Sequence, residues 1–119
     1  MKKNVMLVED DLNTINSLKN YIGTFYKNID LTDVYYLDPK TNIEKIVQDI
    51  QTKNIELLFV DGLDGDWKNI LDKLKENNVN ARFVLVSGNL SYVEEARKLG
   101  IPSYDKDYYS VLKKEIGEP

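Results

Sequence analysis

The residues in this sequence whose types could support chemistry follow short apolar segments. Glu9 and Asp10 follow VMLV, Asp61 follows LLFV, and Ser87 follows FVLV. Lys106 comes soon after a weaker apolar segment, IPSY. Open α/β sheets bind ligands at the carboxyl ends of their strands. If the apolar segments are parallel strands, we therefore expect these side chains to meet at one rim of a sheet.

Glu9, Asp10 and Asp61 would form an oxygen-only cluster at that rim. Carboxylates within about 4–6 Å of one another raise each other's pKa unless a cation lies among them. The chain has no cysteine and no histidine, which excludes thiolate and imidazole metal sites and every histidine-dependent triad. Hard oxygen ligands favour Mg²⁺ that keeps several waters. The pattern therefore predicts a Mg²⁺ site.

Phosphoryl chemistry follows from the same set of residues. Beside a metal, Asp61 could act as a nucleophile toward a phosphoryl group. The metal and Lys106 would offset charge on the equatorial oxygens, and the Ser87 hydroxyl would donate a hydrogen bond. Each residue alone has a simpler explanation, because Asp and Ser are good helix N-caps. Asp11 in particular is expected to be a cap or a surface charge.

Five short apolar segments predict the strands that would position these residues. They are residues 5–8, 31–37, 57–60, 83–86 and 101–104. The segments 5–8, 57–60 and 83–86 are nearly continuous in apolar character, as in strands that are buried on both faces. Pro102 cannot donate to a strand ladder, so the last strand is expected at a sheet edge.

Amphipathic spacings between these segments predict five helices. They cover about residues 11–26, 41–50, 67–74, 91–100 and 108–116. Thr41 with Glu44, and Ser91 with Glu94, have the spacing of capping boxes. Gly100 and Gly117 are placed to end the last two helices.

The alternation of strands and helices predicts an α/β fold. We expect one domain over residues 1–119, a flavodoxin-like three-layer sandwich with five helices around a five-stranded parallel sheet. The strand order 2-1-3-4-5 would make the first and third strands neighbours. That order would bring Glu9, Asp10 and Asp61 together.

Composition narrows the possible functions. Hydrophobic residues are 42%, charged residues are 30%, and the formal net charge is −4. This acidic balance argues against direct nucleic-acid binding by the domain, because phosphate contacts need clustered Lys and Arg. No apolar run has the length of a membrane span, and MKKN before the first strand is too short for a signal peptide. We therefore expect a cytoplasmic protein without membrane contact.

The motifs make the sequence similar to the response-regulator receiver family of two-component signalling, over essentially all 119 residues. VMLVEDD, LLFVD, FVLVSG and the Lys106 segment carry the resemblance. It implies that Glu9 and Asp10 are the family's acidic pair, with Asp10 the direct Mg²⁺ ligand. It also implies that Asp61 is the phosphoacceptor, and that Ser87 and Lys106 bind the phosphoryl group.

The resemblance implies further roles around the site. The backbone carbonyl of Leu63 would be another metal ligand. Leu63 and Asn89, two residues past the acceptor and the hydroxyl, would tune attack by water on the phosphoaspartate. An apolar Leu63 cannot orient a water, so autodephosphorylation is expected to be slow. Tyr104 is the candidate for the aromatic side chain that rotates on switching.

The resemblance also implies partners. The phosphodonor would be a histidine kinase or a histidine phosphotransfer protein, which would supply the histidine that this chain lacks. Switching would control a target protein or an output domain, and the face formed by the last two helices and the last strand could carry target or homodimer contacts. The expected activity is limited to Mg²⁺-dependent self-phosphorylation and autodephosphorylation, so the domain is not expected to be an enzyme.

Three features depart from the family pattern. A short glycine-containing loop, GLDGDW, follows Asp61 where the family usually has Met-Pro. Asp107 follows Lys106 where the family has proline after a cis peptide bond, so a trans bond is expected here. The family's switch aromatic stands three residues before the lysine, but Ser103 has that place and Tyr104 stands two before it.

Other functions remain open. The departures favour, as the main alternative, a pseudo-receiver that recognises a protein partner without phosphorylation. A phosphatase similar to the haloacid dehalogenase family would need Asp where Leu63 stands. A Ca²⁺ loop would need a 1-3-5 spacing that Asp61, Asp64 and Asp66 lack.

Overall fold

The computed structural model describes residues 2–37 and 39–119, with the backbone alone for residues 39–41. The strands are β1 (Lys3–Glu9), β2 (Ile29–Tyr35), β3 (Leu57–Asp61), β4 (Arg82–Val86) and β5 (Ser103–Tyr104). The helices are α1 (Leu12–Phe25), α2 (Pro39–Thr52), α3 (Trp67–Glu76), α4 (Leu90–Lys98) and α5 (Tyr108–Glu115). A 3₁₀ turn, η1 (Leu63–Gly65), joins β3 to α3.

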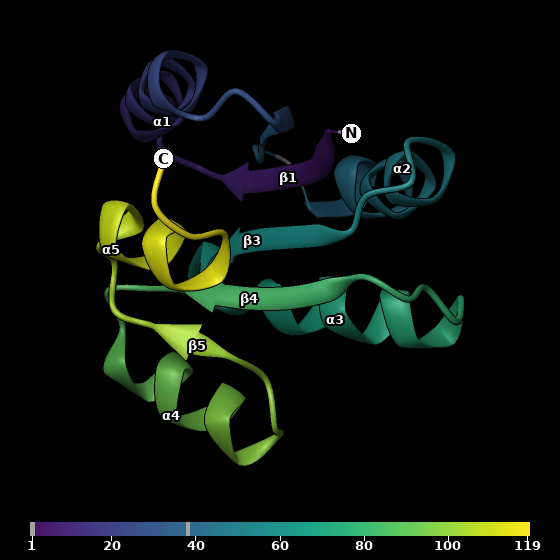
Figure 1. The fold of residues 1–119 in the computed structure, drawn as a ribbon. Helices are drawn as coiled ribbons and strands as arrows, with labels where there is room; N and C mark the ends of the chain where they lie inside the picture. Colours follow the sequence, from purple (N-terminus) through teal and green to yellow (C-terminus); the bar gives the residue numbers. More distant parts are fainter. Residues whose placement is uncertain (1, 38) are drawn as a thin grey trace.

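The strands form one parallel sheet in the order β2-β1-β3-β4-β5. The predicted α/β fold and its 2-1-3-4-5 strand order are therefore confirmed. The arrows of β1, β3 and β4 point toward the same side of the molecule in Figure 1. Pairing of Val8 with Val60 places the ends of β1 and β3 side by side. The acidic residues that end these two strands must then lie close together.

Helices cover both faces of the sheet, as the apolar strands require. One core joins Val5, Leu7 and Phe59 to α1 and α5, and the other joins Met6, Val8 and their neighbours to α2, α3 and α4. Successive strand residues point to opposite faces, so both sets are buried. In Figure 1, α5 lies in front of the sheet and α3 lies behind it.

The ends of the elements confirm some expectations and correct others. Asp11 is the N-cap of α1, as expected. The N-cap of α4 is Asn89, whose side chain accepts the amide of Ser91, so the capping box predicted at Ser91 is wrong. Asn89 is a better cap here because its short side chain reaches the second helical amide. Gly100 and Gly117 follow α4 and α5 with φ of 78° and 108°, as helix-ending glycines do.

Two segments differ from the expected lengths. β5 has only two residues, and it lies at the sheet edge as Pro102 predicted. The carbonyl of Pro102 accepts a hydrogen bond from the amide of Leu85, 2.9 Å away. The second helix begins at Pro39 rather than at Thr41. The Thr41 side chain of the predicted capping box lies outside the described residues.

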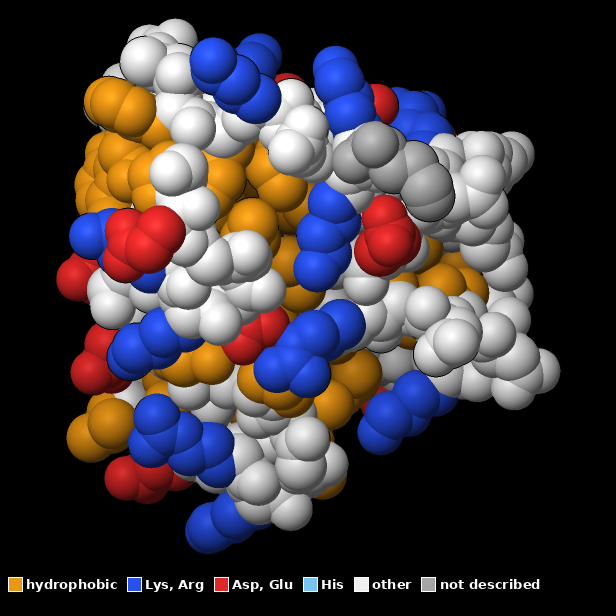
Figure 2. Space-filling model, in the orientation of Figure 1, with side chains coloured by type: hydrophobic (Ala, Val, Ile, Leu, Met, Phe, Trp, Pro, Cys, Tyr) orange, Lys and Arg blue, Asp and Glu red, His pale blue; other side chains and the backbone are white. Residues whose placement is uncertain are grey.

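The surface carries charges of both signs. Figure 2 shows basic and acidic side chains interspersed with hydrophobic ones over the face viewed there. Among the residues that the structure describes, no helix combines the length and the hydrophobicity that crossing a membrane requires.

Candidate functional site

The structure brings the three acidic residues of the sequence motif together. Glu9 ends β1, Asp61 ends β3, and Asp10 follows Glu9 directly. One carboxylate oxygen from each lies within 4.8 Å of the others. Glu9 is fully buried, Asp61 is 7% exposed, and Asp10 is open to solvent. The site thus has a buried wall and an open side.

Lys106 enters this cluster from the segment between β5 and α5. Its Nζ atom lies 2.9 Å from Oδ1 of Asp61 and 3.2 Å from Oε1 of Glu9. No cis peptide bond occurs among the described residues, so the expected trans bond before Asp107 is confirmed. Asp107 caps α5 through a bond from the amide of Ser110. The aspartate therefore starts the helix while the lysine side chain reaches the site.

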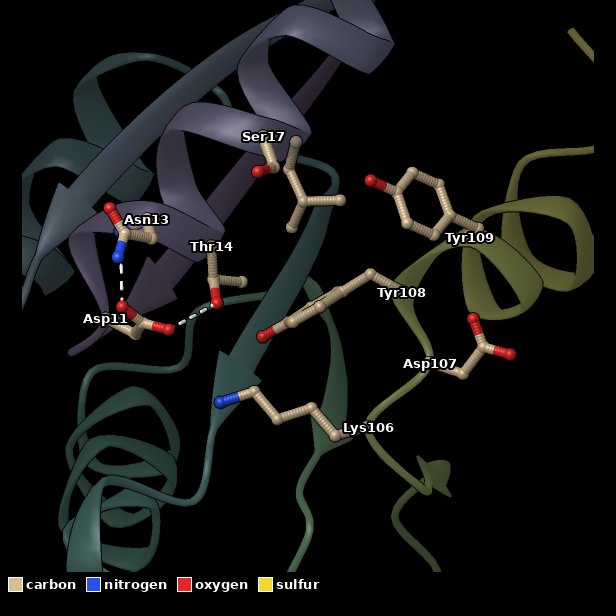
Figure 3. A pocket seen from close by; sticks show the side chains of 9 residues that line it. Asp11, Asn13, Thr14, Ser17, Lys106, Asp107, Tyr108 and Tyr109 are labelled. Atoms are coloured by element: carbon tan, nitrogen blue, oxygen red, sulfur yellow. Dashed lines mark hydrogen bonds between the residues drawn. The ribbon is translucent and has the colours of Figure 1, made fainter.

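Tyr108 also reaches the cluster, which the sequence did not predict. Its hydroxyl donates a 2.8 Å hydrogen bond to Oε2 of Glu9. In Figure 3, Lys106 and Tyr108 point the same way, and Asp107 between them points away. No local pattern suggests Tyr108, because it is the first residue of α5 and its contact with Glu9 depends on the bend at Lys106.

Burial and charge repulsion shape the acidity of Glu9. Burial is the main cause that raises its pKa, from 4.5 to about 7, and the charge of Asp61 raises it further. The hydrogen bond from Tyr108 and the charge of Lys106 act in the opposite direction. Without a cation the carboxyl is therefore partly protonated near neutral pH. Carboxylates repelling one another in this way favour a bound metal ion.

Lys106 and Tyr108 keep their protons in this environment. Burial lowers the pKa of Lys106, but its hydrogen bonds and the charges of Asp61 and Glu9 outweigh burial and raise it. Burial, followed by the charge of Glu9, raises the pKa of Tyr108 well above its usual value. Both side chains therefore act as hydrogen-bond donors over the physiological range.

The loop after Asp61 has a constrained backbone. The amide of Leu63 donates to Oδ2 of Asp61 over 3.0 Å. Leu63 and Asp64 have φ of 51° and 53°, in the left-handed region. The Leu63 side chain is 3% exposed and packs in the core beside Trp67. The backbone carbonyl of Leu63 accepts a hydrogen bond from the amide of Asp66. This bond uses one of the two lone pairs of the carbonyl oxygen.

Ser87 lies beside this loop at a close approach to Gly62. A Cβ atom at Gly62 would lie 2.8 Å from Oγ of Ser87 and 2.9 Å from a ring carbon of Tyr92. Only glycine fits at this position without a shift of its neighbours. Oγ of Ser87 accepts the amide of Asn89 over 3.0 Å, so the hydroxyl proton is not used in that bond.

Tyr104 points away from the acidic cluster. Its hydroxyl donates to Oε2 of Glu115 over 2.8 Å, and Nζ of Lys114 lies 5.4 Å from its ring. Ser103 faces α4 instead and donates to the carbonyl of Val93. The aromatic side chain that approaches Gly62, as Ser87 does, is Tyr92 of α4. Sequence position did not suggest this residue, because the contact depends on the loop at Gly62.

Asp64 and Asp66 do not extend the acidic cluster. Within the described part of the chain, the one group of three or more potential ligands is formed by Glu9, Asp10 and Asp61. The side chain of Asp66 accepts hydrogen bonds from Tyr36 and Asn69. Asp66 therefore bonds the segment after β2 and the first turn of α3 rather than the acidic cluster.

The donor set fits Mg²⁺. It consists of oxygen atoms from three converging carboxylates, of which Asp10 is exposed and leaves room for water ligands. Lys106 offsets part of the negative charge at the buried wall. A small divalent cation would offset the remainder.

A groove opens beside Lys106 between α1 and the start of α5 (Figure 3). Its volume is about 560 Å³. Its walls include Asp11, Thr14, Ser17, Lys106 and Tyr109. Asp11 accepts a bond from the Thr14 hydroxyl over 2.7 Å, which fixes the first turn of α1 at the rim. The groove therefore offers polar and aromatic contacts next to the site.

No protein-family model and no curated protein sequence matches the chain. Solved structures do match its fold. The signal receiver domain of a protein assigned as a Luxo repressor from Vibrio parahaemolyticus aligns with a TM-score of 0.73 and 17% identity, over 98% of this chain and 88% of that chain. A LuxR family DNA-binding response regulator from Silicibacter pomeroyi aligns with a TM-score of 0.68 and 16% identity, over 92% and 85%.

The chain therefore has the fold of a signal receiver domain. The similarity expected from the sequence motifs is confirmed at the level of fold, since identities of 17% and 16% establish no more than that.

Proposed function

We propose that this chain is a response-regulator receiver that accepts a phosphoryl group on Asp61 with the help of Mg²⁺. One observation carries the proposal. Asp61 lies within a cluster of three carboxylates, and Lys106 bonds it at 2.9 Å. An acceptor that has no histidine of its own needs a nucleophilic oxygen, a place for a hard cation and a fixed positive charge to receive a phosphoryl group.

Each residue has a role in this reaction. A carboxylate oxygen of Asp61 forms the new P–O bond, and the P–N bond of a phosphohistidine on the donor breaks. Lys106, already paired with Asp61, would balance charge on the transferred group. The hydroxyl of Ser87, which accepts the amide of Asn89, would donate its proton to an oxygen of that group. Glu9, Asp10, Asp61 and the carbonyl of Leu63 would hold Mg²⁺, which would supply charge neutralisation.

The donor would be a histidine kinase or a histidine phosphotransfer protein, because this chain has no histidine. The groove supports this assignment, since a side chain in it would lie next to Lys106, which bonds the acceptor Asp61. One of the similar structures described above is a DNA-binding response regulator. By analogy, the phosphorylated domain would control an output domain or a target protein, in the cytoplasm, through contacts or homodimers on the α4-β5-α5 face.

Asp61 phosphorylation can be tested by intact-mass measurement. The chain is mixed with acetyl phosphate and MgCl₂, and one added phosphoryl group is expected. Asp61→Asn should abolish the addition. Asp64→Asn is the matched control, because Asp64 is an exposed acidic residue of the same loop and Asn tolerates its left-handed backbone. Equal phosphorylation of the Asp61→Asn variant would refute the assignment.

A second candidate is a phosphorylation-independent pseudo-receiver that binds a protein partner. Its support is that both oxygens of Asp61 already accept hydrogen bonds, from Lys106 and from the amide of Leu63. A satisfied carboxylate needs no ligand to be stable in the fold. Absence of phosphorylation by acetyl phosphate, together with absence of Mg²⁺ binding, would favour this function.

A further inference from the structure

The hydroxyl of Tyr108 donates a hydrogen bond to Oε2 of Glu9, whereas the other donors described around Glu9 bond Oε1. Oε1 of Glu9 accepts from Nζ of Lys106 and from the amides of Asp10 and Asp11, over 3.1–3.2 Å. Oε2 accepts from the hydroxyl of Tyr108 over 2.8 Å. Glu9 is fully buried and Tyr108 is 6% exposed, so water is largely kept from this pair.

We propose that Tyr108 is a positioning residue that fixes the buried carboxylate of Glu9 and, through Glu9, the ammonium of Lys106 beside Asp61. This inference rests on the proposed function, because it assigns a role within the same site. A phenylalanine would fill the same core position in the layer formed by α1 and α5. The hydroxyl is therefore the part of the side chain that needs an explanation beyond packing.

Loss of the hydroxyl would leave Oε2 of Glu9 without the donor that the structure gives it. A buried acceptor that loses its partner is unfavourable, so the carboxylate would turn toward another donor. Its other oxygen is shared with Lys106, whose Nζ bridges Oε1 of Glu9 and Oδ1 of Asp61. A turn of Glu9 would therefore displace the ammonium group as well.

The chain connects these two donors directly. Lys106 and Tyr108 are two residues apart and point the same way, while Asp107 between them caps α5 (Figure 3). The start of α5 and the segment before it are thus attached to β1 through two bonds to one carboxylate, 97 and 99 residues away in sequence. The positions of the Tyr108 and Lys106 side chains are therefore coupled through the carboxylate of Glu9.

The test is the affinity for Mg²⁺ of the full chain, measured by calorimetric titration with MgCl₂. Tyr108→Phe should weaken binding by about 10-fold or more, as is usual when an outer partner of a metal ligand is removed. Tyr26→Phe is the matched control. Tyr26 is also buried in the same layer, and its hydroxyl donates over 2.8 Å to the carbonyl of Gly117, remote from the site.

A double-variant cycle separates positioning from a general loss of structure. If Tyr108 acts through Glu9, Tyr108→Phe should have a much smaller effect on Mg²⁺ affinity in a Glu9→Gln background than in the wild type. Equal effects in the two backgrounds, or equal effects of Tyr108→Phe and Tyr26→Phe, would overturn the inference. Wild-type affinity in the Tyr108→Phe variant would overturn it while leaving the proposed function in place. A wild-type chain that binds no Mg²⁺ would overturn both.

Discussion

Nζ of Lys106 lies 2.9 Å from Oδ1 of Asp61, although 45 residues separate them in the sequence. The contact links the end of the central strand β3 to the segment before α5. It also joins the one positive charge of the cluster, within the described residues, to the proposed nucleophile. Stability and chemistry at this site therefore depend on the same ammonium group.

Replacing Lys106 with Met should lower the stability of the fold and slow phosphorylation of Asp61. Two buried carboxylates would lose their cation, and we expect the free energy of unfolding at pH 7 to fall by about 1–3 kcal/mol. Phosphorylation by acetyl phosphate should slow by about 100-fold, the cost of losing one charge-stabilising donor. Urea unfolding and intact-mass time courses measure the two effects. Lys106→Arg, which keeps the charge, should retain more of both, and equal losses in the two variants would contradict this explanation.

Glu9 should give the stability a distinctive pH dependence. Its pKa is about 7 in the folded chain, against 4.5 for an unperturbed glutamate. Between these values the folded state keeps a proton that the unfolded state has lost, so stability falls as the pH rises from 4.5 to 7 and then stays level. The total fall is of the order of 3 kcal/mol.

Urea unfolding without metal at several pH values measures this fall. Glu9→Gln should remove it, so the difference between wild type and variant isolates the contribution of Glu9 from other titrating groups. Mg²⁺ should stabilise the wild type more at pH 8 than at pH 5, because the ion binds the ionised carboxylate. A stability difference between wild type and Glu9→Gln that does not change with pH would show that Glu9 is not perturbed.

Gly62 should tolerate no larger residue. In Gly62→Ala, the added Cβ would lie 2.8 Å from Oγ of Ser87 and 2.9 Å from the Tyr92 ring. Overpacking of this kind costs about 1–3 kcal/mol in the free energy of unfolding. Gly23→Ala in α1 is the control, because its Cβ would meet no atom within 4 Å. The control should gain up to about 1 kcal/mol from helix propensity. An unchanged midpoint for Gly62→Ala in urea would contradict the close approach.

Loss of the phosphoryl group from Asp61 should be slow. The Leu63 side chain is apolar and lies in the core, so it cannot hold a water at the site. The decay of the phosphorylated mass after removal of acetyl phosphate measures the rate. Leu63→Asn is a poor test, because an amide at this buried position would also destabilise the core. Asn89→Ser is more suitable, since Ser can still cap α4, and it should change the rate. Decay complete within the mixing time would refute a slow reaction.

The central part of the fold and site could be predicted because it depends on short-range patterns. The apolar runs before Glu9, Asp61 and Ser87 specify buried parallel strands, and strand order then places their ends together. Lys106 could be placed because it comes two residues after the end of the edge strand. These predictions needed only the side-chain period of a strand and the topology rules.

The remaining contacts depend on tertiary geometry that no local pattern encodes. The bond from Tyr108 to Glu9 joins residues 99 positions apart. The left-handed backbone at Leu63 turns its side chain into the core, although its position near Asp61 suggested a place facing the site. Tyr104 pairs with Glu115 because β5 is only two residues long and its alternation puts Ser103, not Tyr104, toward α4.

The most direct test of the phosphoacceptor assignment is the amide NMR spectrum during addition of MgCl₂ and then beryllofluoride, which mimics an aspartyl phosphate. We predict that Mg²⁺ alone shifts the signals around Asp10 and Asp61, and that beryllofluoride shifts those of Asp61, Ser87 and Lys106 only when Mg²⁺ is present. A spectrum that both additions leave unchanged would contradict the proposed function.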